Sequence, residues 1–536
     1  MPHCAHDKLQ TIPSPYAQEV GYKPYTIQQL FTAATGSRKQ VSADFEQYAS
    51  CFPAPLVLPG DELSQDPKCP PQSFNSWLNE KARNGVTRER ETVYVAAPVR
   101  LVGLRNTRGK AAGHVMTDWS EPRAGVIAAK ERLVQPPPTL DIIAYLQGLF
   151  HDLPVKQLPN DLNFTSDSWE HDTAHRCAPP RAFGSNICTC SLPFHVELQS
   201  REAGIATRIR VRHLDQAKDT YTPYLHQLNL NDLLDHAIAI LPEDAYCLLM
   251  MVDQDLYEDE NDDFCCGRAY GGSRIAVVSS AQYQPALDGW HGVDVRDGHS
   301  WPGSHCSEFV TRTSAVSGSI GKHKRAAADS RSNALTSRPQ IGSRSQGLPA
   351  SDAIIIDSSM LDDGHLDVPP QTAPLDAAVA AHQRALKGKG GLTLADLKSL
   401  YLRRLCLTSS HEILHCFGLA HCVYAACAMQ STASMIEDSR QPPYLCIVCE
   451  HKLSWAVRGS KMPKSKRTPS SIGNAQPKRP GGEWWSEKEV VDWRISRNRA
   501  IMAFCDARGA GGNDLGNLGF ASLSSWTAGV LELGSA

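Results

Sequence analysis

Hydrophobic and polar residues follow two periods along the chain, and these periods predict where helices and strands lie. Residues 139–150 repeat apolar side chains at helical spacing, with Thr139 placed to cap the first turn, and residues 228–241 show the same period. Residues 194–200 and 207–214 alternate apolar and polar side chains, which is typical of half-buried strands. The pattern therefore predicts helices and strands mixed along one segment.

Two apolar runs and one long periodic run complete this picture. Residues 245–253 and 274–280 each contain a continuous apolar run and are expected to form buried strands. The long run predicts one helix that begins after a capping box of Thr393 and Asp396. It is expected to end at Gly418, because glycine suits the left-handed conformation that commonly follows a helix.

Changes in composition divide the chain into six segments. These are an N-terminal region of uncertain fold (1–138), a first mixed segment (139–285), a low-complexity insertion (286–350), a second mixed segment with the long helix (351–458), a basic linker (459–482) and a C-terminal helical segment (483–536). Residues 313–350 are rich in Ser, Arg, Gly and Ala and are expected to be disordered. The basic stretch at 458–479 suits a nuclear address, although such charge runs are more often solvated linkers.

Composition is that of a soluble globular protein with room for roughly two to four domains. Of 536 residues, 41% are hydrophobic and 21% charged, and the net charge of −3 gives no general attraction to nucleic acid or anionic membranes. The sequence shows neither a membrane-spanning apolar run nor the apolar core of a signal peptide. We therefore expect a cytoplasmic or nuclear protein that is not secreted, with no nucleic-acid or membrane partner.

The stretch HEILHCFGLAHC, residues 411–422, carries the clearest chemistry. On a helix, His411 and His415 lie one turn apart on the same face, where two imidazoles can share a metal ion. Glu412 is rotated away from them and can reach a water bound to that metal, while the chain turns at Gly418 and brings His421 back as a third nitrogen ligand. Three neutral ligands and one open position are typical of a catalytic zinc site.

The competing interpretation is a helix end that happens to be rich in histidine. A bare HExxH pattern recurs by chance, but Gly418 and His421 stand at the further offsets that a long zinc-binding motif requires. A helix end without a metal leaves Glu412 and Gly418 unexplained. The metal site is therefore the favoured hypothesis.

The seventeen cysteines of the chain include a compact group directly after this stretch. In a long chain without an export signal, grouped cysteines indicate metal binding more often than disulfides. The two pairs are expected to close a four-thiolate structural zinc site that holds the third histidine in place. A redox-active CxxC is the alternative, but it would leave the other pair without a role. The four residues are Cys422, Cys427, Cys446 and Cys449.

These motifs together resemble the archaemetzincins. HEILHCFGLAHCVYAACAM followed by CIVC is similar to their signature, with a spacing between Met429 and Cys446 that is one residue shorter. The resemblance extends over roughly residues 140–285 and 351–460, including the DQDLY turn at Asp253, and more weakly near 495–535. HSWPGSHC, residues 299–306, is similar to a motif of eukaryotic members.

The resemblance implies a metzincin-like α+β fold with a twisted mixed sheet, an active-site helix and a Cys4 zinc subdomain. It implies a zinc metallopeptidase that acts on peptide or protein substrates and holds two zinc ions, one catalytic and one structural. His411, His415 and His421 would bind the catalytic zinc, and Glu412 would be the general base. It also suggests aminopeptidase-like action on short peptides.

Several further roles follow from the resemblance. Ile275, Ala276 and Val277 would belong to an edge strand that binds substrate backbone, with an ordinary buried strand as the alternative because the run does not alternate cleanly. Met429 would lie beneath the catalytic zinc. Met435 is a second candidate for that position, and a methionine that only fills core space is the alternative for both.

Two questions about function stay open in the sequence. The acidic stretch at residues 253–263 can hold the free amine of a peptide, but a solvated loop is the more common fate of such a run. Two rival functions are a zinc-stabilised binding protein without catalysis and a nucleic-acid-binding zinc module. Glu412 argues against the first, because a non-catalytic site needs no general base, and the near-neutral net charge argues against the second. Cleavage preference and oligomeric state are not indicated.

Overall fold

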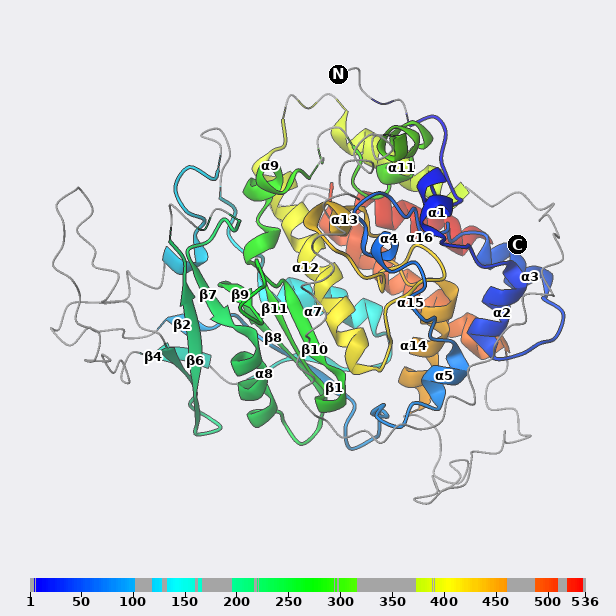
Figure 1. Cartoon of the computed structure of the whole chain (residues 1–536). Helices are drawn as coiled ribbons and strands as arrows, with labels where there is room; N and C mark the ends of the chain where they lie inside the picture. Colours follow the sequence, from blue (N-terminus) through cyan, green and yellow to red (C-terminus); the bar gives the residue numbers. More distant parts are fainter. Residues whose placement is uncertain are drawn as a thin grey trace, which may run out of the picture.

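Figure 1 shows a computed structural model of the whole 536-residue chain. The structure describes residues 4, 6–101, 118–127, 133–159, 162–165, 195–215, 219, 221–293, 295, 298–315, 373–387, 389, 391–459, 487–509 and 518–533. Within these residues helices and strands are mixed, which confirms the predicted α+β class.

A five-stranded sheet lies at the centre of the fold. Its strands, in spatial order, are β10 (Gly267–Tyr270), β11 (Ile275–Ser279), β8 (Ala245–Val252), β1 (Thr92–Ala96) and β3 (Val155–Gln157). All neighbours pair in parallel except β10, which pairs antiparallel with β11. The two apolar runs predicted as buried strands are β8 and β11, and both predictions are confirmed.

Both faces of this sheet are covered at its centre, which explains why the central strands β8 and β11 are almost entirely apolar. On β8, Cys247, Leu249 and Met251 face one core, which includes side chains of helices α7 and α12. Leu248 and Met250 face a second core, shared with α8 and the other sheet. A strand buried on both sides has no polar face, so its sequence cannot alternate.

The prediction that residues 275–277 form an edge strand is wrong. β11 lies between β8 and β10, and the side chains of Ile275, Ala276 and Val277 are fully buried. The alternative of an ordinary buried strand holds instead. The edge of the sheet on this side is β10, which the sequence analysis did not single out.

A second, six-stranded sheet covers one side of the first, at the left of Figure 1. Its strands, in spatial order, are β2 (Arg100–Leu101), β4 (Leu162–Thr165), β5 (His195–Ser200), β6 (Ile205–His213), β7 (His226–Asn229) and β9 (Asp255–Tyr257). Helix α8 (Leu230–Ala239) packs between the sheets. β5, β6 and α8 confirm the strands and the helix predicted there.

Helices fill the other side of the central sheet. α12 crosses the middle of Figure 1 next to β10 and β11, and α7 packs beside it. The bounds are α7 (Thr139–Leu149), α11 (Ala373–Leu386), α12 (Leu394–Cys416), α13 (Met435–Arg440), α14 (Ile447–Gly459), α15 (Glu487–Gly509) and α16 (Ala521–Leu533). The predicted C-terminal helical segment is confirmed by α15 and α16. Thr139 does not cap α7: it is the first helical residue, and Pro138 occupies the cap position without a side-chain bond.

The N-terminal region is an integral part of this fold. It contains five short helices and then β1, which lies inside the central sheet. The helices are α1 (Pro15–Val20), α2 (Ile27–Thr35), α3 (Ala43–Ala49), α4 (Glu62–Gln65) and α5 (Phe74–Leu78). Since β1 precedes residue 138, the expected boundary at 138/139 does not separate two structural units.

Part of the expected low-complexity insertion is also folded. Residues 286–293 and 298–315 include the short helix α9 (Asp288–His291), and Trp301 and Val310 are buried. Aromatic and aliphatic anchors hold these residues against the core, so the expected disorder is wrong for 313–315. The rest of the insertion, 316–350, lies outside the described residues, as does most of the basic linker, 460–482.

No helix among the described residues is both long and apolar enough to cross a membrane.

Candidate active site

The helix that carries the first two histidines is fixed at both ends. At its start the Thr393 hydroxyl accepts the backbone N–H of Asp396, and the Asp396 carboxylate accepts the N–H of Thr393, which confirms the capping box. At its end Gly418 has φ +79°, the left-handed conformation predicted from the sequence. The chain therefore leaves the helix in a defined direction three residues before His421.

Backbone carbonyls orient the two helical histidines. His411 Nδ1 lies 2.8 Å from the carbonyl oxygen of Ala428, and His415 Nδ1 lies 2.7 Å from that of Leu419. A carbonyl oxygen only accepts, so each Nδ1 must carry the proton. Each Nε2 then presents a lone pair, and the two Nε2 atoms lie 3.0 Å apart.

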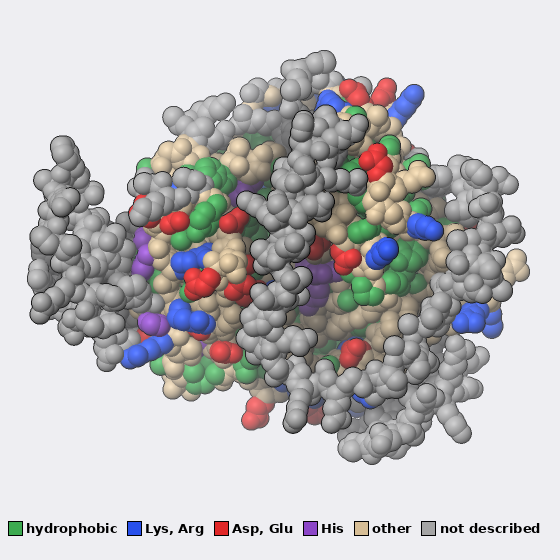
Figure 2. Space-filling view, in the orientation of Figure 1, with side chains coloured by type: hydrophobic (Ala, Val, Ile, Leu, Met, Phe, Trp, Pro, Cys, Tyr) green, Lys and Arg blue, Asp and Glu red, His purple; other side chains and the backbone are tan. Residues whose placement is uncertain are grey.

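His421 completes the cluster from the turn after the helix. Its ring centroid lies 5.4 Å from that of His411 and 4.9 Å from that of His415, and the three rings offer ligand atoms within 4.8 Å of one another. His421 is exposed, so the cluster has an open side. Histidine side chains are visible at the centre of the face in Figure 2, where α12 lies in Figure 1.

The donor set fits a zinc ion. Two imidazole lone pairs that face each other at 3.0 Å repel unless a cation lies between them. In a tetrahedral zinc site with bonds of 2.0–2.1 Å, two such nitrogens are about 3.3 Å apart. The hydrogen bonds of both Nδ1 atoms to carbonyls are the arrangement that fixes metal-binding histidines in the correct tautomer.

Glu412 is the acidic side chain of this cluster. It is 9% exposed, and burial raises the pKa of its carboxyl group to about 8, an effect that the charge of Arg268 on β10 opposes. Burial also lowers the pKa of His411 and of His415, which favours the neutral imidazoles that a metal requires. A buried carboxyl with a raised pKa, on the same helix as His411 and His415, is suited to proton transfer.

Residues of the N-terminal region and the central sheet close the end of the helix. The indole N–H of Trp77 donates to the carbonyl of Phe417 at 2.9 Å, and the Tyr246 hydroxyl donates to that of Cys416 at 3.1 Å. Gly271 packs so closely that a Cβ there would meet the carbonyl oxygen of His415 at 2.5 Å. The last carbonyls of a helix have no partner within it, and these contacts supply partners.

The turn toward His421 is held by one glutamine. The Gln72 side chain donates to the carbonyl of Gly418 at 2.9 Å and accepts the N–H of Ala420 at 3.0 Å. Lys452 of α14 is buried, and its ammonium group donates to the Gln72 side chain at 2.9 Å. Gln72 therefore links the histidine turn to α14, the helix that carries Cys449.

A second glutamine supports His411. Gln441 donates to the carbonyl of Ala428 at 2.9 Å and to that of Gln430 at 2.8 Å. The Ala428 carbonyl is the same group that accepts from His411 Nδ1. Gln441 therefore fixes the acceptor that orients the first histidine.

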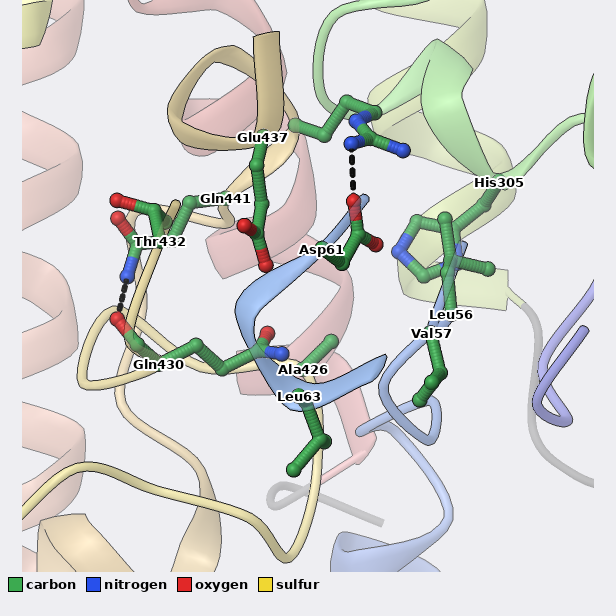
Figure 3. Close-up of a pocket in the computed structure, with 11 residues that line it drawn as sticks. Leu56, Val57, Asp61, Leu63, His305, Ala426, Gln430, Thr432, Glu437 and Gln441 are labelled. Atoms are coloured by element: carbon green, nitrogen blue, oxygen red, sulfur yellow. Dashed lines mark hydrogen bonds and ion pairs between the residues drawn. The ribbon is translucent and has the colours of Figure 1, made fainter. Parts of the chain in front are cut away.

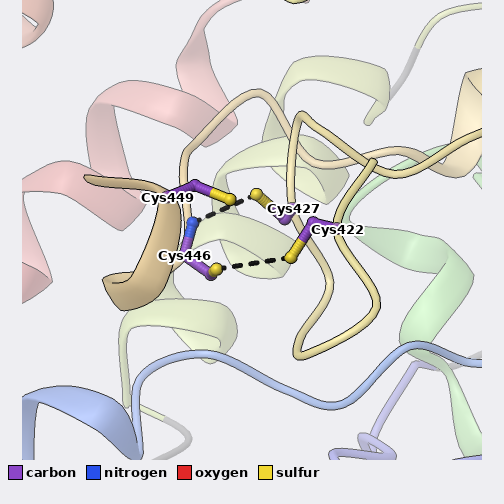
Figure 4. A group of neighbouring side chains, drawn as sticks. All are labelled: Cys422, Cys427, Cys446 and Cys449. Carbon is purple, nitrogen blue, oxygen red and sulfur yellow. Dashed lines mark hydrogen bonds between the residues drawn. The ribbon is translucent and has the colours of Figure 1, made fainter. Parts of the chain in front are cut away.

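The four cysteines form the closed counterpart of the histidine cluster (Figure 4). Their sulfur atoms lie within 4.8 Å of one another, and each side chain is at most 4% exposed. Cys427 Sγ accepts the N–H of Cys446 at 3.2 Å and that of Met429 at 3.5 Å. Backbone N–H groups directed at sulfur stabilise thiolates, so the set fits a structural zinc.

The N-terminal region contacts the loop between Cys422 and Cys427, which begins directly after His421. The Tyr22 hydroxyl donates to the carbonyl of Val423 at 2.9 Å, and the N–H of Ala426 donates to the carbonyl of Pro53 at 2.8 Å. The loop thus has partners on both sides, which limits its movement and that of His421.

The two methionine candidates lie in different places. Met429 follows Ala428 directly and is fully buried in the core that contains α12. Met435 begins α13, and its sulfur lies 3.7 Å from that of Cys266. The backbone link through Ala428 to His411 favours Met429 over Met435 as the residue beneath the histidines.

The acidic stretch at 253–263 is a solvated loop only in part: residues 259–261 and 263 are exposed, as that expectation requires, whereas residues 254–257 are buried. Asp255 is fully buried and accepts hydrogen bonds from Gln282, Gln227 and Thr222, so it is neither solvated nor open to a substrate amine. Glu258 pairs with Arg268 at 2.6 Å. These contacts join β9, which lies in this stretch, to β7 of the same sheet and to β10 of the central sheet.

A pocket beside the segment that supports His411 has Gln430 and Gln441 among its lining residues (Figure 3). It is lined by Asp61, Glu437 and Arg440 among others, and Arg440 pairs with Asp61 at 2.5 Å. Glu437 accepts the backbone N–H groups of Glu62 and Ala433. These contacts fasten α4 to α13 and occupy the charged groups of the pocket.

Sequence reasoning missed Gln72, Trp77, Gln441, Tyr246 and Arg268. Gln72 and Trp77 reach their partners across more than 300 residues of chain. A single glutamine or tryptophan outside any motif gives no local signal of such a contact.

Comparison with known proteins finds similarity in the segment that carries the histidine and cysteine clusters. Residues 393–455 match a model described as Peptidase family M54. Archaemetzincin-2 of Homo sapiens is 39% identical over 88 residues, which is 16% of this chain and 24% of that protein. Archaemetzincin-1 of Mus musculus is 34% identical over 84 residues, or 16% of each chain. The matches thus span at most about a quarter of these relatives.

A solved structure of archaemetzincin (amzA) from Methanopyrus kandleri aligns over 69% of this chain and 97% of that one. Its identity is 12% and the TM-score 0.26, which supports no conclusion about a shared fold. The resemblance to the archaemetzincins is confirmed at the level of sequence, and residues 393–455, which contain all seven clustered histidines and cysteines, match the model of Peptidase family M54.

Proposed function

We propose that this protein is a zinc-dependent metallopeptidase. The observation that carries the proposal is the arrangement of His411 and His415, whose Nδ1 atoms are bonded to carbonyls while their Nε2 atoms converge beside His421. The match of this segment to a peptidase family supports the same reaction class.

His411, His415 and His421 would hold the catalytic zinc, and Cys422, Cys427, Cys446 and Cys449 a structural one. A zinc ion on three imidazoles supplies Lewis acidity, which lowers the pKa of water to about 7 and polarises a peptide carbonyl.

Glu412 is the general base of the proposed reaction. Its carboxylate takes a proton from the attacking water and delivers it to the amine that leaves when the peptide bond breaks. The buried position keeps this group out of bulk solvent, so that the proton is retained for the leaving group.

The substrate strand is proposed to bind along β10. This strand is the sheet edge nearest the histidines, because Gly271 at its end packs against the carbonyl of His415. An extended peptide can add to such an edge through backbone hydrogen bonds. The proposal replaces Ile275, Ala276 and Val277 as substrate contacts, since these residues are buried within the sheet.

Aminopeptidase-like action is the finer form of the proposal, and it rests on the resemblance alone. Asp255 is occupied internally and does not supply a site for a free amine. Mapping the new N-termini in a digested peptide mixture decides the question: removal of single residues from one end supports it, and internal cuts contradict it.

The test of the reaction is Glu412→Gln, a change that keeps size and removes the base. We expect peptide hydrolysis to fall by about 100- to 10,000-fold while zinc content and unfolding temperature stay unchanged. Glu260→Gln, at an exposed position, is the control and should keep full activity.

Hydrolysis by Glu412→Gln at the wild-type rate would defeat the proposal. Binding of a hydroxamate by the wild-type protein, with no cleavage of any peptide in a mixed library, would instead favour the rival function of a zinc-stabilised binding protein.

A further inference from the structure

A third group of metal-ligating side chains lies outside both clusters described above. Cys4, His6 and Cys306 offer two sulfur atoms and one ring nitrogen within 4.8 Å of one another. The sulfur atoms of Cys4 and Cys306 are 3.1 Å apart, although 302 residues separate them in sequence. Cys306 is the last residue of the HSWPGSHC motif, which has no role in the proposed peptidase site.

Backbone pairing brings these residues together. Leu9 and Cys306 form an antiparallel backbone bridge. On either side of it, the N–H of Ser307 donates to the carbonyl of Lys8 at 2.9 Å, and the N–H of Gln10 donates to the carbonyl of His305 at 2.7 Å. Residues 8–10, which follow Cys4 and His6, are therefore held beside residues 305–307, which include Cys306. The meeting of the two thiols is a consequence of this pairing.

The surroundings of His6 are shaped by two glycines. A Cβ on Gly298 would lie 3.2 Å from His6 Nε2, and one on Gly303 would lie 3.2 Å from His6 Cε1. Gly298 has φ +83°, a conformation that other residues rarely adopt. Side chains at either position would crowd the imidazole out of its place.

A buried histidine adjoins the same spot. His382 of α11 is 5% exposed. A Cβ on Gly298 would lie 3.9 Å from His382 Nε2 and 3.2 Å from His6 Nε2, so both ring nitrogens lie close to Gly298. His382 Nε2 has no hydrogen-bond partner among the described residues. A buried ring nitrogen without a partner is costly in a folded protein, and a metal ion or metal-bound water close by would give it one.

The chemistry of the group suits zinc. Two thiols and an imidazole are the ligand types that zinc prefers, and the soft sulfur donors disfavour calcium and magnesium. Cys4 Sγ also receives a backbone hydrogen bond from His6. The carboxylate oxygen Oε2 of Glu308 lies 3.8 Å from Cys4 Sγ and is a further oxygen ligand available beside the group.

We propose that Cys4, His6 and Cys306 bind a zinc ion that fastens the N-terminal segment to residues 299–308. Trp301 of this second segment donates its backbone N–H to Ser439 of α13, so the site anchors the N-terminus to the part of the fold that carries Gln441. The proposal does not depend on peptidase activity, because none of its ligands lies in residues 393–455.

The test is the zinc content of the full chain, measured by native mass spectrometry together with elemental analysis. We expect Cys4→Ser to bind one zinc fewer per chain than the wild type, and His6→Gln to show the same loss. Cys4 is half-buried near the end of the chain, so the substitution leaves the core intact. Cys69→Ser, at a cysteine of similar exposure outside every cluster, is the matched control and should lose no zinc.

Two outcomes would overturn the proposal. One is an unchanged zinc content in both Cys4→Ser and His6→Gln. The other is a wild-type mass lower by two hydrogen atoms, with a peptide map that joins Cys4 to Cys306, which would show a disulfide in place of a metal. If the histidine cluster of α12 binds no zinc, the number of zinc ions per chain is lower by one in the wild type and in every variant alike. The difference in zinc content between Cys4→Ser and the wild type then still tests the site at Cys4, His6 and Cys306.

Discussion

The histidine cluster and the cysteine cluster adjoin in sequence but differ in access to solvent. His421 is exposed, whereas Cys422, the next residue, is 4% exposed, and the other three cysteines are buried more deeply. Three ligands with an open side are typical of a catalytic metal site, and four buried thiols are typical of a structural one. The difference shows how one short loop can serve chemistry on one side and stability on the other.

The two clusters also differ in what orients them. Carbonyl oxygens of Ala428 and Leu419 accept from the histidines and leave their Nε2 lone pairs available. Backbone N–H groups of Cys446 and Met429 instead point at the sulfur of Cys427 and stabilise negative charge. Neutral ligands keep the charge of a bound cation available to a substrate, while four thiolates neutralise it.

The largest effect is expected from breaking the closed cluster. Binding of a structural zinc contributes on the order of 10 kcal/mol in small domains, so Cys446→Ser should be insoluble or should unfold at a much lower temperature. Cys505→Ser, at an equally buried cysteine outside the clusters, should stay soluble. A soluble Cys446→Ser protein with the wild-type unfolding temperature would contradict the structural role.

A chelator should separate the two clusters without any mutation. Because His421 is exposed and the cysteines are not, we expect peptide hydrolysis to disappear before the unfolding temperature changes. Activity and thermal unfolding are measured on the same samples along a chelator series. Simultaneous loss of both would mean that the two clusters do not differ in access.

A smaller effect is expected from the glutamine behind His411. Gln441→Met keeps the length of the side chain but removes its hydrogen bond to the Ala428 carbonyl. Loss of such a supporting bond typically weakens metal affinity about 10- to 100-fold, which competition with a zinc indicator measures. Gln284→Met, at a buried glutamine that bonds to Val134, is the control. Equal affinities for the two variants would remove Gln441 from the account.

The smallest effect is expected at the turn before His421. Gln72→Ala removes two hydrogen bonds to the turn, each contributing about 1 kcal/mol, so zinc affinity should fall by a few-fold up to about 30-fold. Gln47→Ala, at an exposed position, provides the baseline. A change no larger than that of the control would show that the cysteine cluster alone places the third histidine.

The sequence predicted the parts of the site that depend on local spacing. The capping box at Thr393, the histidines one turn apart and the turn at Gly418 are all set within one stretch of chain, and periodicity or residue type reveals them. The grouping of four cysteines was likewise visible as two short spacings.

The parts that failed depend on pairings between distant segments. Strand order decides that β10 and not β11 is the edge, and no local pattern in residues 274–280 contains that order. β1 enters the central sheet from a region that showed only short apolar runs. Gln441 and Gln72 each act through two hydrogen bonds to backbone groups, which any glutamine can make and which sequence spacing does not mark.

Anomalous X-ray scattering at the zinc edge, from crystals of the full chain, tests the central claim most directly. The account predicts one peak within about 2.1 Å of a ring nitrogen of each of His411, His415 and His421, and a second peak among the four cysteine sulfurs. A map with a peak among the cysteines and none among the three histidines would contradict it.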